Sequence, residues 1–226
     1  MKSKTILAFL LPLLLRALIA SFPHSGQGNH HGSKTAYGGD YEAQRHWMEL
    51  TLHLPISQWY KYDLTYWGLD YPPLIAYGSY VMGWASHILV GEESVALFDS
   101  RGYEDPVHKA FMRSTVMFWD AFVYFPIVYL LCKRLSGGSQ DETLRLWLGA
   151  VIQPALVVID NGHFQYNNVC LGLALGAFHF MTLSDAIGFY GVIGSILFCL
   201  ALNWKQMGLY ITLRQCLRIC FLKVFS

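Results

Sequence analysis

Apolar segments separated by polar stretches dominate the pattern of hydrophobic positions along the chain. They cover residues 6–19, 72–90, 115–131, 144–159, 169–183 and 187–202. Long apolar runs without the strict alternation of half-buried strands predict helices. Because a helix needs about 20 apolar residues to cross a bilayer, the pattern predicts an all-α, polytopic membrane protein with several short spans.

The first segment reads as a transmembrane span that covers residues 1–23. Lys2 and Lys4 precede it and place its start on the cytoplasmic side. A cleaved signal peptide is the alternative, but the small residues near its end do not form a small-x-small cleavage site. Arg16 lies close to the far end, where we expect it to reach the membrane interface.

Residues 24–71 form a polar stretch that holds nine tyrosines and tryptophans, rings that favour the headgroup level of a membrane. One apolar stripe with helical spacing runs through it, formed by Ala43, Trp47, Leu50 and Leu54. Asp40 stands at the start of this helical pattern and Pro55 ends it. We therefore expect a helix in the membrane interface, with the polar side that carries Glu42, Arg45 and His46 facing water.

The polar loops give the orientation of the spans. Loop 132–145 carries Lys133, Arg134 and Arg145, whereas loop 91–109 is mainly acidic, so the former is the better cytoplasmic candidate. Strict alternation of all segments contradicts this assignment. One segment therefore does not cross the membrane fully. We expect this to be segment 72–90, which begins with a Pro-Pro pair.

Composition narrows the class of protein. The chain has 226 residues, of which 54% are apolar and 14% charged, with a net charge of +1. These values argue against an ordinary soluble enzyme, a disordered protein and a nucleic-acid partner. The five cysteines lie in or beside apolar runs, so we interpret them as packing residues. Since no nucleotide-binding or metal-binding motif occurs, the sequence predicts no metal ligands and no resident cofactor.

Several polar residues are candidates for chemistry, each with a structural alternative. Asp40 is either a helix N-cap or a general base. Asp120 lies within an apolar run. There it either forms a hydrogen bond or ion pair with a neighbouring helix or belongs to a functional site. Lys205 ends the last run and either reaches the interface or faces an anion, while Asp70 and Tyr71 read as a turn that enters a helix.

Residues 160–168 form a polar island between two apolar runs, which is costly at bilayer depth unless it lines water or a cavity. The island is either an inter-helix turn or a binding site. As a site, His163 suits a phosphate, and amides such as Gln165 suit sugar hydroxyls.

The literal strings of these polar regions carry a family resemblance. They are HSGQG at 24–28, GDYEAQRHWME at 39–49, YWGLDYPPL at 66–74, SRGYE at 100–104, DNGHFQYNN at 160–168 and LNWKQM at 202–207. In order and wording, over about residues 6–210, they resemble the dolichyl-phosphate-glucose-dependent α-1,3-glucosyltransferases of the endoplasmic reticulum. The wording fits enzymes that add the first glucose to the lipid-linked oligosaccharide better than the sister enzymes that add the second.

This resemblance implies a GT-C type membrane fold whose active site faces the lumen of the endoplasmic reticulum. It implies inverting glucose transfer from dolichyl phosphate glucose to a high-mannose, dolichyl-linked acceptor, with both lipids as partners. Asp40 then matches the catalytic base of the first luminal loop. The residues that it suggests for substrate binding are Glu42, Arg45, His46, Asp70, Tyr71, His163, Gln165 and Lys205. Asp40 and His163 should share the luminal side, so an even number of the three segments between them crosses.

The chain departs from the family pattern at two places. Asn161 stands where the family usually has a histidine, and residues 211–226 do not match the expected continuation of a family about twice as long. We therefore expect a first span (1–23), a luminal loop (24–71), the remaining helices of a partial core (72–210) and a divergent tail (211–226). A truncated, non-catalytic membrane isoform is the alternative function.

Overall fold

The computed structural model describes residues 2–24, 39–183 and 188–210, and every regular element in these ranges is a helix. The α-helices are α1 (Lys2–Ala20), α2 (Gly39–His53), α3 (Pro73–Leu89), α4 (Pro106–Trp119), α5 (Phe125–Leu135), α6 (Gln140–Val151), α7 (Pro154–Val157), α8 (Asn167–Met181) and α9 (Phe189–Trp204). Two short 3₁₀ helices, Ile56–Gln58 and Glu92–Ser94, and two π-helical segments, η3 (Asp120–Tyr124) and η4 (Val158–Phe164), complete the list. The all-α prediction is confirmed for the part of the chain that is described, while the predicted tail 211–226 lies outside it.

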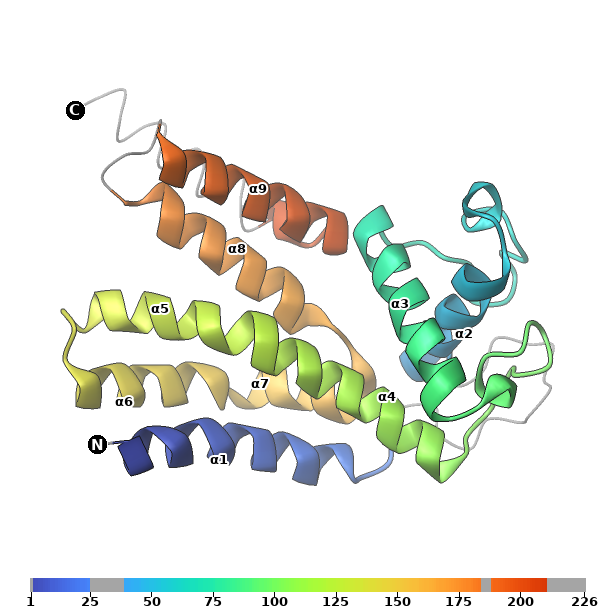
Figure 1. Ribbon diagram of the computed structural model, residues 1–226, viewed down its shortest axis with the longest axis horizontal. Coiled ribbons are helices and arrows are strands. Elements are labelled where there is room, and N and C mark those ends of the chain that lie inside the picture. Colours follow the sequence, from blue (N-terminus) through green and yellow to red (C-terminus); the bar gives the residue numbers. More distant parts are fainter. Residues whose placement is uncertain (1, 25–38, 184–187, 211–226) are drawn as a thin grey trace.

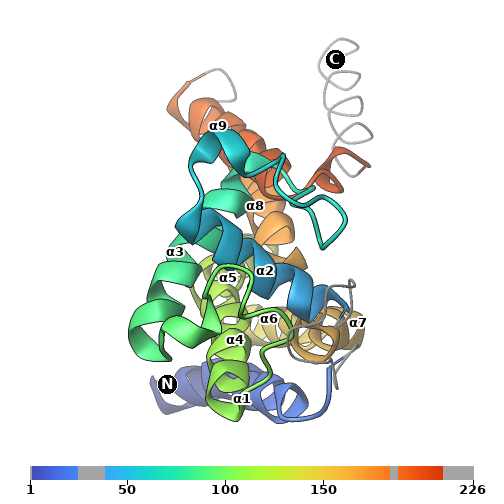
Figure 2. The ribbon, with the colours of Figure 1, turned by 90° about the vertical axis from the view of Figure 1, so that its right-hand side faces the viewer.

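The helices form a bundle with a separate pair at one end. In Figure 1, α1, α6 and the α4–α5 helix run side by side, and α8 and α9 pack together above them at an angle. Helices α2 and α3 pack against each other at the end of this bundle (Figures 1 and 2). Helix α2, which comes from the polar stretch of the sequence, thus lies against α3 and η4.

A long helix made of α4, η3 and α5 crosses the bundle. Its start is fixed by Asp105, whose carboxylate accepts from Val107 N at 2.8 Å, and by a proline at the first helical position. The π turn of η3 comes directly before α5, which carries Pro126 in its first turn. Proline has no N–H and its ring crowds the carbonyl four residues earlier, so a widened turn at this place accommodates it.

Among the described helices, Pro106–Leu135 is long and apolar enough to cross a membrane, with 30 residues. The pair Gln140–Val151 and Pro154–Phe164 passes the same test together, with a bend of 50° between its halves. Helices α8 and α9 are apolar but shorter. Short spans were expected from the sequence, and the second half of the bent pair ends within the polar island, at Phe164.

Helix α3 is the segment expected not to cross fully, and it is not among those long, apolar helices. It packs closely on α2 instead. A Cβ atom added at Gly83 would lie 2.7 Å from the Met48 carbonyl oxygen, so the glycine permits this approach of the two backbones. That segment 72–90 does not cross the membrane fully stays a prediction.

Arg16 does not reach an interface, so that expectation is wrong. Its guanidinium is fully buried and pairs with Asp120 at 2.7 Å. Asp120 also accepts from the side-chain amides of Asn168 at 2.8 Å and Asn161 at 3.2 Å. A buried carboxylate on η3 offers the guanidinium a stronger partner than a distant water layer does. Asp120 therefore links neighbouring helices through these bonds, as the structural interpretation of this residue predicted.

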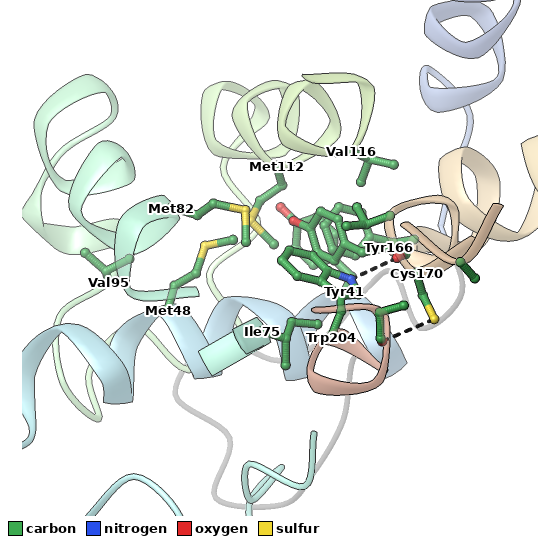
Figure 3. Packing of buried hydrophobic residues seen from close by; sticks show 14 residues of the cluster. Tyr41, Met48, Ile75, Met82, Val95, Met112, Val116, Tyr166, Cys170 and Trp204 are labelled. Atoms are coloured by element: carbon green, nitrogen blue, oxygen red, sulfur yellow. Dashed lines mark hydrogen bonds between the residues drawn. The ribbon is translucent and has the colours of Figure 1, made fainter. Parts of the chain in front are cut away.

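A buried apolar cluster lies beneath the site region (Figure 3). It includes Tyr41 from α2, Tyr166 directly before α8 and Trp204 at the end of α9, and Trp204 Nε1 donates to the Tyr166 carbonyl at 3.1 Å. These three aromatic residues directly neighbour Asp40, Gln165 and Lys205 in the sequence. The core thus fixes the backbone beside each of these polar residues.

The packing interpretation holds for Cys132 and Cys170, which are buried, but is wrong for Cys199, which is exposed on α9. An apolar neighbourhood in the sequence does not tell which side of a helix faces the core. Cys216 and Cys220 lie outside the described residues.

We expect Arg16→Met to destabilise the chain by about 3–5 kcal/mol, because it leaves the buried Asp120 carboxylate without its ion-pair partner. The double variant Arg16→Met/Asp120→Asn should lose less, since no unpaired charge remains. Chemical unfolding in detergent measures both. Lys133→Met, at an exposed position, is the control, and equal loss in the control and in Arg16→Met would contradict the assignment.

Candidate active site

Asp40 lies in the first turn of α2, which begins at Gly39 with a φ of +59°. It therefore belongs to the helix rather than preceding it as an N-cap. The free N–H groups of this turn and the helix dipole favour a negative charge here. The side chain remains 36% exposed, so the carboxylate is fixed by the helix and open to solvent.

The polar island meets this carboxylate through two side chains. His163 Nε2 lies 2.7 Å from Asp40 Oδ2, and Gln165 Nε2 donates to the same oxygen at 2.5 Å. Within residues 39–183 and 188–210, no donor contacts Asp40 Oδ1. One oxygen is thus held by the protein, and the other is available to a substrate.

A backbone feature brings both donors to one oxygen. Phe164, between His163 and Gln165, has a φ of +88°, which a bulky residue rarely adopts. Its ring is fully buried and packs edge-on against Tyr41 at 5.2 Å between centroids. The turn at Phe164 ends η4 and leaves Gln165 in an extended conformation. The buried ring holds the strained turn in place.

Lys205 joins the cluster from the end of α9. Its Nζ donates to Gln165 Oε1 at 3.0 Å and to Asn167 Oδ1 at 2.7 Å, and it lies 4.9 Å from the centre of the Tyr71 ring. Gln165 therefore bridges the Asp40 carboxylate and the Lys205 ammonium. A cavity of about 550 Å³ adjoins Lys205 and is lined by Asp70 and Tyr71 as well, among others.

Of the residues expected from the sequence, the structure thus brings together Asp40, His163, Gln165, Lys205, Tyr71 and Asp70. It places Glu42, Arg45 and His46 elsewhere. All three are buried, at 1%, 0% and 0% exposed. The expectation that the polar side of this helix faces water is wrong.

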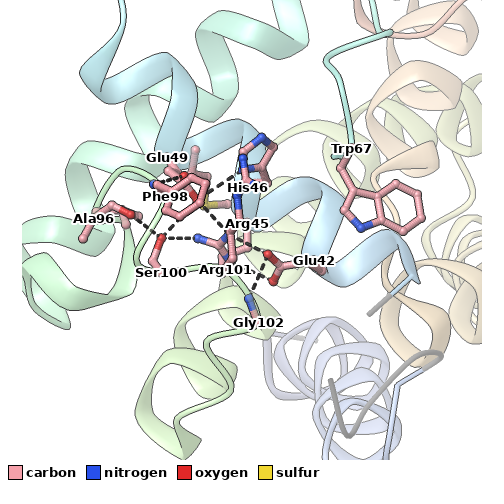
Figure 4. Close-up of polar contacts among 12 residues, drawn as sticks. Glu42, Arg45, His46, Glu49, Trp67, Ala96, Phe98, Ser100, Arg101 and Gly102 are labelled. Atoms are coloured by element: carbon pink, nitrogen blue, oxygen red, sulfur yellow. Dashed lines mark hydrogen bonds and ion pairs between the residues drawn. The ribbon is translucent and has the colours of Figure 1, made fainter. Parts of the chain in front are cut away.

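The polar side of α2 is covered by loops that come from other parts of the chain (Figure 4). Arg45 pairs with Glu42 and Glu49 and donates to Ser100 Oγ at 2.5 Å. Glu42 also accepts from Tyr66 Oη at 2.9 Å and from Gly102 N at 3.1 Å. The buried charged groups therefore find their partners within the protein, and these contacts fasten α2 to two loops.

This buried network contains residues that sequence reasoning missed as partners. Glu49 accepts from Phe98 N at 2.5 Å, and Arg101 pairs with Asp63 at 2.6 Å. The signal in the sequence is the spacing of Glu42, Arg45 and Glu49, at i, i+3 and i+7, which places ion pairs along one helix face. The loop partners give no such local signal.

Arg113 on α4 is a second residue that the sequence did not single out. Its guanidinium donates to the carbonyl oxygens of Asn161 at 2.6 Å and Gly162 at 3.0 Å. The residue is 5% exposed, and a cation at the end of η4 suits the partial negative charge of its carbonyls. It fixes the backbone that directly precedes His163.

Asn161, the departure from the family pattern, is fully buried and points away from Asp40. Its side chain donates to Asp120, on the opposite side of the polar island from His163. The island thus has two sides, one toward the buried ion pair and one toward the carboxylate on α2. Within the described parts of the chain, no three His, Cys, Asp or Glu side chains gather as a metal site would require.

Comparisons with known proteins match this chain over most of its length. A family model described as "ALG6, ALG8 glycosyltransferase family" matches residues 4–222. The dolichyl pyrophosphate Man9GlcNAc2 alpha-1,3-glucosyltransferase of Gallus gallus is 44% identical over 205 residues, which cover 89% of this chain and 38% of the relative. The protein of that name in Saccharomyces cerevisiae is 43% identical over 211 residues, 89% of this chain and 36% of the relative.

A probable enzyme of the same name in Caenorhabditis elegans is 44% identical over 210 residues, 91% of this chain and 39% of the relative. The chain therefore spans between 36% and 39% of the length of these curated relatives. All of the polar residues gathered around Asp40 fall inside the range of the family match.

The buried network makes the stability of the chain depend on pH. Burial raises the pKa of the Glu49 carboxyl, but the hydrogen bond with His46 and the charge of Arg45 outweigh burial and lower the pKa from 4.5 to about 2. A carboxyl whose pKa is lower in the folded state stabilises the fold above pH 4.5. This contribution is lost as the pH falls toward 2.

We expect the thermal midpoint in detergent to fall between pH 4.5 and 2, and to fall less steeply in Glu49→Gln, which carries no titrating group there. Glu142→Gln, at an exposed position on α6, is the matched control and should keep the slope of the unchanged chain. Parallel profiles for all three proteins would refute a stabilising role for the Glu49 charge.

Proposed function

Because the chain belongs to the ALG6, ALG8 glycosyltransferase family, we propose that it carries the catalytic base of an inverting α-1,3-glucosyltransferase. The donor in this proposal is dolichyl phosphate glucose, and the acceptor is the dolichyl pyrophosphate-linked Man9GlcNAc2 oligosaccharide for which the curated relatives are named. The enzyme acts at the luminal face of the endoplasmic reticulum membrane.

The observation that carries the proposal is the arrangement around Asp40. Its Oδ2 accepts from His163 and Gln165, whereas Oδ1 faces no donor in the described part of the chain. Two donors on one oxygen hold the carboxylate in a single orientation. A general base needs such a fixed orientation, together with an oxygen within reach of the hydroxyl that it deprotonates.

Inversion at the sugar requires one displacement. Asp40 Oδ1 takes the proton of the acceptor hydroxyl while that oxygen bonds to the anomeric carbon of glucose. The bond between this carbon and the phosphate oxygen breaks, and the electron pair leaves with the phosphate. The ammonium of Lys205 stabilises the charge that develops on the leaving phosphate.

The buried residues of α2 support this chemistry indirectly in the proposal. Glu42, Arg45 and His46 have no exposed surface of note, so direct contact with a substrate would require the network to open. We assign them the role of holding the first turn of α2, and thus Asp40, against the loops. Asp70 and Tyr71 line the adjoining cavity and contact the donor there.

A polytopic membrane fold of GT-C type accompanies this function. Its support is the apolar surface of the bundle, since Leu7, Leu14 and Leu18 on α1 are each more than 60% exposed. Phe122 on η3 is 68% exposed as well. Soluble monomers rarely expose continuous apolar faces of this extent, whereas lipid chains solvate them.

We expect Asp40→Asn to lower glucose transfer by about 10²–10⁴-fold, the usual contribution of a general base. Membranes that contain the chain are assayed with radiolabelled dolichyl phosphate glucose and the lipid-linked acceptor. Asp141→Asn, an exposed carboxylate on α6, should keep the full rate. Full activity of Asp40→Asn would rule out Asp40 as the base.

The same assay separates the two members of the family. An acceptor without glucose should be the substrate for transfer of the first glucose, and an acceptor that already carries one glucose for transfer of the second. Folded chain that transfers glucose to neither acceptor would instead point to a non-catalytic membrane isoform.

A further inference from the structure

A cavity of about 410 Å³ lies where α4 begins beside the end of α1 (Figures 1 and 2). It is lined by small and apolar residues, by two serines and by the cations Lys109 and Arg113. No aspartate or glutamate is among the described residues that line it, and none of the side chains that contact Asp40 is among them either. A cavity with two cations and no carboxylate is suited to an anion.

Arg113 has donor capacity that the described protein does not use. The residue is 5% exposed, and two of its N–H groups donate to the carbonyl oxygens of Asn161 and Gly162. A guanidinium carries further donors, and the buried Nε of Arg113 meets no acceptor in the described parts of the chain. An unmet donor on a buried cation is costly. An anion in the cavity gives this guanidinium a partner that the described residues do not supply.

Lys109 lines the cavity from the same side of α4 as Arg113, one turn earlier. Like charges at i, i+4 repel each other, and an anion between them removes this repulsion. The two serines, Ser21 and Ser114, donate to carbonyl oxygens of their own helices at 2.6 Å and 2.7 Å. The lysine and the arginine are therefore the groups that donate to an anion here.

The position of the cations along the helix matches the headgroup level of a membrane. The helix Pro106–Leu135 has 30 residues. At about 1.5 Å per residue it is about 45 Å long, whereas the hydrocarbon core of a bilayer is about 30 Å thick. Its ends therefore extend beyond the hydrocarbon, and Lys109 and Arg113 lie in its first two turns.

Apolar side chains continue from these cations toward the middle of the helix. Met117, one turn after Arg113, also lines the cavity. Phe118 and Phe122 follow and are more than half exposed, as is Leu18 on α1. Cations followed by exposed apolar side chains repeat the order of headgroup and chains in a membrane lipid.

We propose that this cavity binds the phosphate of an anionic glycerophospholipid, whose acyl chains lie along the exposed apolar side chains of α1 and α4. The phosphate bridges Lys109 and Arg113. Basic pockets between membrane helices bind anionic headgroups in this way. The site does not depend on the glucose transfer proposed above.

Charge decides between kinds of headgroup. A zwitterionic headgroup would bring its own ammonium next to Lys109 and Arg113, and no carboxylate among the described lining residues would receive it. A pyrophosphate carries more negative charge than one phosphodiester. The carbonyls of Asn161 and Gly162 already offset part of the Arg113 charge, so the cavity suits the phosphodiester better.

Arg113 connects this site to the polar island. The carbonyls that it holds belong to the two residues directly before His163, and its guanidinium carbon lies 5.7 Å from the centre of the Phe164 ring. A phosphate that fixes the guanidinium also fixes this backbone. Bound lipid should therefore raise the thermal midpoint of the chain.

Titration of the purified full chain in detergent with short-chain lipids tests the site. The probes are dioctanoyl phosphatidylglycerol, dioctanoyl phosphatidylcholine, farnesyl pyrophosphate and inorganic phosphate. We expect Lys109→Met to weaken binding of the phosphatidylglycerol about tenfold, the effect of losing one charged hydrogen bond. Lys109→Arg should keep the affinity. Lys133→Met removes the same charge from the exposed far end of the same helix and should bind like the unchanged chain.

A matched pair of substitutions tests the cavity itself. Ala110 and Val107 are both exposed on α4, but Ala110 lines the cavity and Val107 does not. Ala110→Trp should weaken binding of the phosphatidylglycerol about tenfold by filling the cavity, and should abolish the rise in thermal midpoint. Val107→Trp adds the same ring outside the cavity and should keep both the affinity and the rise.

The other outcomes reject the proposal. Unchanged affinity of Lys109→Met, or equal affinities of Ala110→Trp and Val107→Trp, would show that the lipid binds elsewhere. Equal binding of the phosphatidylcholine would reject selection of an anionic headgroup, and tighter binding of farnesyl pyrophosphate would assign the cavity to an isoprenoid pyrophosphate. Inorganic phosphate that binds as tightly as the phosphatidylglycerol would indicate a free-anion site. Because none of these measurements uses glucose transfer, the proposed function can fail without affecting them.

Discussion

The Asp120 carboxylate, buried in an apolar bundle, is the constraint on which the rest of the structure depends. An ionised carboxylate in such surroundings is tolerated only with a paired charge and hydrogen bonds. Arg16 from α1 and the amides of Asn161 and Asn168 supply them. Four elements are thereby tied together at one point. Because η4 is one of these elements, its far side can present His163 to Asp40.

Two clusters of charged residues on and beside α2 differ in one physical respect. Around Arg45 the acceptors and donors are largely satisfied within the protein, and the side chains are buried. Around Asp40 one carboxylate oxygen and one N–H of Lys205 have no partner among the described residues, and the groups are partly exposed. The first cluster is therefore suited to hold a helix, and the second to bind a ligand.

The sequence predicts the helices well because apolar runs and prolines mark their ends locally, as at Pro55 after α2 and at Pro73 in α3. It singles out the polar island because acids and amides between apolar runs are unusual, and it singles out Asp40 because this residue starts a helical pattern and matches the base that the family resemblance implies. It fails for Arg16 and for the polar side of α2, because periodicity shows which face is polar but not what covers it. The covering partners, such as Ser100, lie 55 residues away from Arg45. The strained turn at Phe164 has no local signal either.

Gln165 explains how a carboxylate and an ammonium coexist in one small site without cancelling each other. A direct ion pair between Asp40 and Lys205 would satisfy both charges and leave neither for a substrate. The carboxamide donates to Asp40 through Nε2 and accepts from Lys205 through Oε1, so it satisfies part of each while keeping them apart. The inverting displacement that we propose needs this separation, because the base and the leaving group act on opposite faces of the sugar. A neutral side chain with one donor end and one acceptor end meets the requirement, whereas a glutamate or a lysine at position 165 would meet half of it.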